Sequence, residues 1–475
     1  MKYSILLMSV LLVLCIVAPG FTSDDFQSWV KQQQKDYKNF LEERDKEFHS
    51  FLKQKWKDFE VEEGQKEDKA PKPSKPPVAE KKEPERENPV KPDVVKKVEK
   101  EKPEQDQIPD VKKTEPKKKF KLTFYGSVYE LPYIKELNTL GRVNADKDSI
   151  ANFFADFASV DTKPLLNSFK YYKSEKNLND WAYFLLIKEF ADKTLKDENA
   201  ASLLTWGLML KSGYDVRAGY SSNKIRLLFA SESSLFSIPF FTLDSKRYYL
   251  FNDDSNSVRS YDAKYEGADK KLKAFFTSRP SFFTGKAGTK KLEFEFENKK
   301  YSITAYYDPY LISFMQTLPQ FSLEKYFMGD PDDLISYYLA NELKEKMKDF
   351  SNTEKVNFLL SFVQKAFPYK TDDEQFSYEK YFYPEEMIYY PYSDCEDRSA
   401  FLAALVKKTT GFDVAVLDYP GHVAVAVNIP GSTAKGDYIK IEGKRYHIAD
   451  PTYINAEAGM LMPEYKNKKP EIFLF

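Results

Sequence analysis

Three residues in the last third of the chain have side chains that together can perform covalent chemistry. Cys395 lies at the predicted start of a helix, His422 begins an alternating strand-like run, and Asp450 ends the next one. A thiol is a strong nucleophile only as a thiolate, so it needs a base, and the base needs a carboxylate that orients it. Cys395, His422 and Asp450 are therefore a candidate constellation for nucleophilic catalysis.

The residues around Cys395 predict how a helix would present the thiol. Ser393 and Glu396 fit a capping box, with Ser393 as N-cap and Glu396 at N3, which puts Cys395 at N2. There the helix dipole and free N–H groups stabilise a thiolate and suit a developing oxyanion. Asp394, Glu396 and Asp397 oppose thiolate formation, so we expect a basic partner.

Strand alternation separates the two histidines of this region. His422, Ala424 and Ala426 share one face of their strand and three valines share the other. We expect the small residues to leave room beside His422 for the approaching helix end. Asp450 lies on the alternate face of its own strand from His447, so His422 is the better base and His447 a bystander.

Each element alone has an ordinary structural explanation: a small buried side chain, a structural histidine, an Asp-Pro turn. Together, in this order, they resemble the transglutaminase-like superfamily, which has papain-like cysteine chemistry. The resemblance covers about residues 331 to 460. It rests on the run from Asp394 to Arg398, on Gly421-His422, and on Asp450-Pro451-Thr452. It implies that Cys395 is the nucleophile, His422 the general base and acid, and Asp450 the orienting residue.

The superfamily contains cross-linking enzymes, deamidases, peptidases, amidases and inactive binding members. The leading prediction is an enzyme that attacks amide bonds of proteins or cell-wall peptides, with hydrolysis favoured over cross-linking. One alternative is a non-enzymatic cell-envelope binding protein, and another is a cell-surface assembly protein organised by residues 24–64. We predict no cofactor and no metal, because the sequence has no EF-hand loop and no Cys/His cluster.

Composition excludes several other classes. The chain has 72 Lys and Arg against 73 Asp and Glu, so the net charge of -1 gives no argument for a nucleic-acid partner. Its 2 Cys and 3 His exclude a disulfide scaffold and a Cys-rich zinc site. His49, the third histidine, lies among charges and receives no function.

The first residues predict export. A lysine, a short apolar run and small residues near position 20 read as a signal peptide at 1–20. Cys15 follows Leu14, where a lipoprotein signal needs a small residue, so we expect no lipid anchor there. If Cys15 leaves with the signal, Cys395 is the remaining thiol of a periplasmic, cell-surface or secreted protein.

Two segments precede the ordered units. Residues 24–64 carry aromatic residues at helical spacing and predict an amphipathic helical segment, either a spacer or a contact to partners or the envelope. Residues 65–118 are rich in Lys, Glu and Pro, which predicts a disordered tether.

The rest of the chain contains a hidden repeat. Gly213-Tyr214-Asp215-Val216 and Lys246-Arg247-Tyr248 recur 198 positions later as Gly411-Phe412-Asp413-Val414 and Lys444-Arg445-Tyr446. We therefore predict an α+β fold with two transglutaminase-like units, each a helix packed on an antiparallel sheet. The degenerate unit spans 119–280, a β-rich connecting region 281–330, and the catalytic unit 331–475.

The same shift predicts that the first unit is inert. It aligns Cys395 with Asp197, His422 with Lys224 and Asp450 with Asn252. We expect Asp197 and Lys224 to form an ion pair, which has no acyl-transfer chemistry. The catalytic unit carries extra chain at 378–392, whose tyrosines either line an acyl-donor cleft or pack as core.

Overall fold

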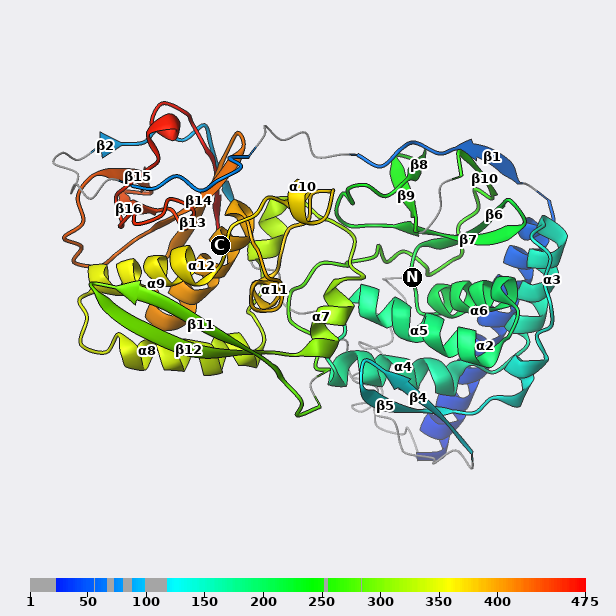
Figure 1. The fold of residues 1–475 in the computed structure, drawn as a ribbon. Coiled ribbons are helices and arrows are strands. Elements are labelled where there is room, and N and C mark those ends of the chain that lie inside the picture. Colours follow the sequence, from blue (N-terminus) through cyan, green and yellow to red (C-terminus); the bar gives the residue numbers. More distant parts are fainter. Residues whose placement is uncertain are drawn as a thin grey trace.

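The structure is a computed structural model with a mixed α+β fold. The predicted signal peptide, Cys15 and Asn252 lie outside the residues that it describes. Those residues are 23–54, 56–65, 72–79, 88–98, 118–251, 255–282 and 284–475. Two antiparallel sheets lie at opposite ends of the molecule, each beside its own helices (Figure 1). The described residues contain no helix with the length and apolar character needed to cross a membrane.

The N-terminal unit packs its sheet on buried helices. The strands, in order across the sheet, are β1 (Lys57–Glu60), β10 (Ser257–Ser260), β6 (Val216–Ser221), β7 (Lys224–Ala230), β9 (Lys246–Leu250) and β8 (Phe240–Leu243). The helices are α3 (Lys147–Ala158), α4 (Lys163–Glu175), α5 (Asp180–Thr194) and α6 (Glu198–Lys211). α6 is apolar on nearly every face, as expected of a helix surrounded by core.

The C-terminal unit has the same layout with extra edge strands. Its strands, in order, are β2 (Asn88–Pro89), β15 (Asp437–Ile441), β16 (Lys444–Ala449), β14 (His422–Val427), β13 (Val414–Tyr419), β17 (Glu471–Leu474) and β3 (Val94–Lys97). Its helices are α8 (Ala340–Lys346), α9 (Asn352–Ala366), α10 (Asp372–Gln375), α11 (Pro384–Tyr389) and α12 (Cys395–Thr410). A π-helical segment at Leu334–Leu339 leads into α8.

The repeat extends to the pairing of individual residues. The order β8-β9-β7-β6-β10 of the first sheet corresponds to β15-β16-β14-β13-β17 of the second. Val216 pairs with Phe229 in β6 and β7, and Val414 pairs with Val427 in β13 and β14. The β7–β9 and β14–β16 pairings likewise agree when shifted by the same number of residues. Because a slip of one residue would reverse every side chain, this agreement carries more information than strand order alone.

The predicted ion pair of the first unit is not formed. Asp197 caps α6 by accepting from the N–H of Ala200, and its other carboxylate oxygen lies 3.6 Å from Arg142. Lys224 is exposed at the start of β7. The helix start does lie against β7, because Asn199 accepts from the N–H of Ile225 at 2.9 Å. The helix start and β7 are neighbours, as predicted, but the predicted ion pair is wrong because the carboxylate of Asp197 caps its own helix.

Parts of the chain before residue 119 contribute to both units, which corrects the tether prediction for residues 72–79 and 88–98. Helix α2 (Ser23–Leu52) buries Phe48 and Leu52 in the N-terminal core, and the chain then forms β1 instead of more helix. β2 and β3 add parallel pairs at the two edges of the C-terminal sheet. Residues 88–98 are therefore part of a folded sheet, because backbone pairing offsets their lack of aromatic side chains.

Two hairpins lie outside the two large sheets. The first consists of β4 (Lys119–Phe124) and β5 (Ser127–Pro132), and its turn residues Tyr125 and Gly126 have φ of 41° and 75°. Such positive φ values favour a tight hairpin turn. The hairpin of β11 (Gly288–Phe296) and β12 (Lys299–Tyr307) packs on α9 through Phe294, so the expected connecting region belongs to the C-terminal unit.

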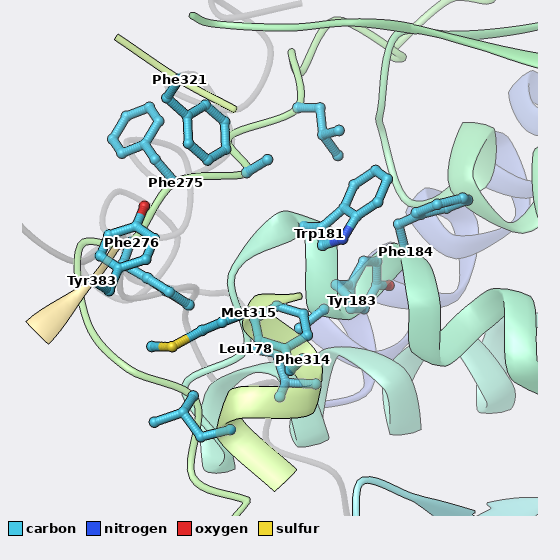
Figure 2. Packing of buried hydrophobic residues seen from close by; sticks show 14 of the residues in the cluster. Leu178, Trp181, Tyr183, Phe184, Phe275, Phe276, Phe314, Met315, Phe321 and Tyr383 are labelled. Carbon is cyan, nitrogen blue, oxygen red and sulfur yellow. The ribbon is translucent and has the colours of Figure 1, made fainter. Parts of the chain in front are cut away.

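Aromatic packing joins the two units. Phe276 meets Tyr383 with ring centroids 4.7 Å apart, and Phe314, from α7 (Pro309–Met315), packs on the other side of Phe276 (Figure 2). Beside these rings Arg279 and Glu385 form a buried ion pair at 2.8 Å. The segment between the units is thus a continuous core and not a loose connection.

Candidate active site

Helix α12 presents Cys395 at its first residue. The N-cap is Asp394, and the carboxylate of Asp397 accepts from the Asp394 N–H at 3.2 Å. We predicted Ser393 as the cap, but Ser393 is held in a short parallel bridge with Tyr369 and is still extended. Cys395 is therefore at N1 and not at N2. This position still lies in the first turn, where backbone N–H groups have no partner within the helix.

His422 and Asp450 are brought together as predicted. The imidazole Nε2 lies 2.8 Å from Oδ2 of Asp450, and both side chains are fully buried. The other oxygen of Asp450 accepts the backbone N–H groups of Thr452 and Tyr453, which fixes the carboxylate. The β14–β16 register explains the contact, because Ala426 pairs with Ile448 and so places both catalytic candidates on one face.

The hydrogen bond to Asp450 determines which nitrogen of His422 can act as a base. When a carboxylate accepts from Nε2–H, the neutral ring carries its lone pair on Nδ1. Nδ1 of His422 is buried and has no hydrogen-bond partner among the described residues. Tyr465 packs on the ring with centroids 4.8 Å apart. The free Nδ1 is therefore the atom that could take a proton from the thiol.

The faces of β14 are used differently from our expectation. The valines of β14 share the main core with Phe401 and Leu402 of α12, so the helix packs on the valine face. Ala426 belongs to the core of the opposite face, with Met462 and Tyr465. The hydroxyl of Ser399 donates to the carbonyl of Val423 at 2.9 Å and attaches the second turn of α12 to β14 beside His422.

The thiol of Cys395 is enclosed and held in its neutral form. Its side chain has no exposed surface, and Sγ donates to a carboxylate oxygen of Glu396 at 2.8 Å. Burial raises the pKa of the Cys395 thiol well above its ordinary value, and the charges of Glu396 and Asp394 raise this pKa further. Lys72 is the cation that opposes these effects. The state seen here is therefore closed around a protonated thiol.

Lys72 was absent from the sequence-based site. Its ammonium lies 2.7 Å from Asp394, 2.8 Å from Glu396 and 2.8 Å from Glu379, and 3.6 Å from Asp372. Burial alone lowers the pKa of Lys72, but Glu396 and Asp394 outweigh it, so the net pKa is raised and the amine stays charged. This is the basic partner that the acidic neighbours of Cys395 require.

The backbone that carries Lys72 is also held. The hydroxyl of Tyr369 donates to the carbonyl of Pro73 at 2.8 Å. The N–H of Ala79 donates to the carbonyl of Ile454 at 2.8 Å, and the N–H of Ile454 donates to the carbonyl of Pro77 at 2.9 Å. Residues 72–79 therefore lie between the residues that flank Cys395 and those that follow Asp450, with a bend at Ser74 and Lys75.

The acidic residues around Lys72 lie close to one another. Burial raises the pKa of Asp372 to about 6 and that of Glu379 to about 7. Asp372, Asp394 and Asp397 bring one oxygen each within 4.8 Å of one another, and so could also provide oxygen ligands to a hard metal ion. In the structure the positive charge beside Asp372 and Asp394 is the ammonium of Lys72.

The residues missed from the sequence have recognisable positions but weak signals. Asp372 and Glu379 lie in or beside the extra chain that we expected at 378–392, so that segment forms a wall of the acidic set. Its outer tyrosines, Tyr378 and Tyr389, are exposed. Lys72 lies in the Lys/Pro-rich tract, where nothing distinguishes it from Lys75.

Comparison with known proteins returned no match to a family model, to a curated protein or to a solved structure.

Proposed function

We propose that the protein is a cysteine enzyme of the transglutaminase-like type that attacks amide bonds through Cys395, His422 and Asp450. The observation that carries the proposal is the 2.8 Å contact of His422 with Asp450, which leaves Nδ1 as a buried lone pair on the unit whose helix begins at Cys395. The residue-by-residue agreement of the two sheets supports the accompanying proposal of two related units, of which the first has lost the reactive residues.

The mechanism follows from the groups present. Nδ1 of His422 removes the thiol proton, and the thiolate attacks the amide carbonyl to form a tetrahedral oxyanion. First-turn N–H groups of α12 are suited to stabilise that oxyanion. The imidazolium then protonates the leaving amine, and a thioester to Cys395 remains. Water, activated by the same imidazole, releases the acid and restores the thiol.

The closed site requires a conformational step before this chemistry. Cys395 and His422 are both buried, and Glu396 accepts the thiol hydrogen bond. The thiol must therefore leave Glu396 and approach Nδ1 when a substrate enters. Residues 72–79 are the segment whose movement would uncover this region, because Lys72 contacts both acidic residues that flank Cys395.

A second candidate is a non-catalytic binding protein, which the full burial and raised pKa of Cys395 favour. The deciding experiment is reaction of Cys395 with an amide- or peptide-based activity probe that forms a thioester or thioether. The enzyme proposal expects labelling that requires Cys395 and His422 and is unaffected by His447→Ala. If labelling is absent both when residues 72–79 are in place and when they are displaced, the result supports the non-catalytic binding protein.

A further inference from the structure

We propose that the carboxylates of Asp372, Glu379, Asp394 and Glu396 form a lysine-binding subsite beside Cys395. Residues 72–79 occupy it as an internal ligand, and a lysine-containing polypeptide from another chain displaces them. The subsite's role in selecting substrates rests on the proposed function. Its ability to bind a lysine is separate and is tested without activity.

The first argument is the set of carboxylates that surrounds the ammonium of Lys72. Lys72 meets carboxylates from three places in the C-terminal unit: α10, the chain after α10, and the start of α12. A buried ammonium is costly to desolvate unless several acceptors surround it. These acceptors are part of the C-terminal unit, whereas the lysine arrives from a segment more than 290 residues earlier. The C-terminal unit therefore forms the pocket, and the lysine that fills it comes from a distant part of the chain.

The second argument is the burial of the acidic residues that line the pocket. Asp394, Glu396 and Asp397 are almost fully buried, and one oxygen of Asp394 has no hydrogen-bond partner among the described residues. Burying such carboxylates away from water is costly unless a cation lies against them. A purely structural arrangement would be better served by apolar side chains. Such a cluster beside a reactive thiol fits a site that must accept and release a cation.

The third argument is the way in which the segment lies. Residues 72–79 are bound through backbone hydrogen bonds to Ile454 and through the Tyr369 hydroxyl, with one buried side chain in a charged pocket. Main-chain pairing with alternate side chains in pockets is how extended peptides are recognised. Proline residues flank Lys72 and lower the entropy lost when such a chain is fixed. The ligand class is therefore a polypeptide segment in which a lysine lies beside a proline.

The experiment measures binding of a labelled peptide, Lys-Pro-Ser-Lys-Pro-Pro-Val-Ala, to the full chain carrying Cys395→Ser. Because residues 72–79 belong to the same chain as the pocket, they act as an internal ligand at an effective concentration of about millimolar. Adding Lys72→Gln should therefore tighten peptide binding about tenfold or more, because the internal competitor is weakened. Lys75→Gln, on the same segment but exposed, should bind like its parent. A peptide with glutamine at its first position should lose the binding.

A measurement on the unsubstituted chain protects the test against a variant that does not fold. Saturating lysine peptide should speed hydrogen exchange at the amide of Ala79, which loses its acceptor when residues 72–79 are displaced, and not at the amide of Ile454, which then donates to the peptide. Equal affinity for the two peptides, or peptide binding that Lys72→Gln leaves unchanged, overturns the subsite. Peptide binding without any labelling of Cys395 by activity probes would instead keep the subsite and reject the proposed enzyme.

Discussion

Lys72 and Asp394 are 322 positions apart in the sequence, and Nζ of the first lies 2.7 Å from Oδ2 of the second. Asp394 is also the N-cap of the helix that begins with Cys395. The carboxylate of Asp394 thus links Lys72, which precedes the first unit, to the helix that begins with the proposed nucleophile Cys395. Changes at Lys72 are therefore expected to alter the chemistry of Cys395 as well as the position of residues 72–79.

Lys72→Gln should change alkylation of Cys395 in two opposite ways. Loss of the ammonium raises the thiol pKa, because Lys72 is the charge that lowers it. Release of residues 72–79 should expose the thiol and raise the rate at high pH, where it is ionised. Iodoacetamide kinetics between pH 6 and 10 separate the two effects, with Lys75→Gln as the matched control. A profile that coincides with the parent at every pH would contradict the link.

His422→Ala should slow reaction of Cys395 with an activity probe by about 100-fold or more, as loss of a general base does elsewhere. His447→Ala should not, because its ring belongs to the neighbouring strand and is not the partner of Asp450. The rate of probe labelling, followed by mass spectrometry, checks both. Equal effects of the two substitutions would reject His422 as the base.

Asp450→Asn should lower the rate by about three to four orders of magnitude while the protein stays folded. The amide in place of the carboxylate favours the wrong imidazole tautomer and does not stabilise an imidazolium. Steady-state rates on a responsive amide substrate are the measurement, and circular dichroism verifies folding. A rate within about twofold of the parent would make Asp450 a turn residue only.

Binding of the lysine peptide to Lys72→Gln should weaken as the pH falls. With the Lys72 ammonium in place, burial raises the pKa of Asp372 to about 6 and that of Glu379 to about 7, and loss of this ammonium raises both pKa values further, so both carboxylates lose charge on acidification. Since an ammonium stabilises the ionised carboxylates, its binding releases protons and becomes stronger as the pH rises through 6 to 8. The other ionisable groups that face the pocket are Tyr369, Lys380, Asp394, Cys395, Glu396 and Asp397. Fluorescence anisotropy at pH 5, 6, 7 and 8 measures the dependence, and stronger binding at pH 5 would contradict it.

Glu385→Gln should destabilise the join between the units by about 3 to 5 kcal/mol, because it removes the carboxylate that pairs with the buried guanidinium of Arg279 and leaves Asp332, whose pKa burial raises to about 8, as the neighbouring acid. Glu293→Gln is the control, since its pair with Lys291 is exposed and worth about 0 to 1 kcal/mol. Urea unfolding of the full chain compares the two variants. Similar midpoints would show that the Arg279–Glu385 pair contributes little.

Strand alternation and short-range order were enough to predict much of the candidate site. The same-face relation of His422 and Asp450 follows from a period of two, and the helix start at Cys395 follows from its local residues. The cap was misplaced by one residue because Ser393 pairs with Tyr369, a contact that no local pattern encodes. Local sequence patterns do not predict a contact between distant segments such as this one.

Lys72 shows the limit more clearly. Its tract is low in apolar residues, which predicts that it cannot fold alone. That reasoning is sound for an isolated segment, but it omits a partner that supplies charge and backbone acceptors. The acids at Asp372 and Glu379 could be read only as solvated charges until the fold placed them around one point. Electrostatic complementarity across hundreds of residues is not a feature of any window of sequence.

The edge strand β3 has a consequence for synthesis of the chain. Val94–Lys97 pair in parallel with Glu471–Leu474. At a translation rate of about 5 to 20 residues per second, β3 waits roughly 20 to 75 seconds before its partner exists. During this interval its backbone donors and acceptors are open to pairing with other chains. The lysines of this tract, which repel one another and resist such pairing, thus protect the nascent chain until the sheet can close.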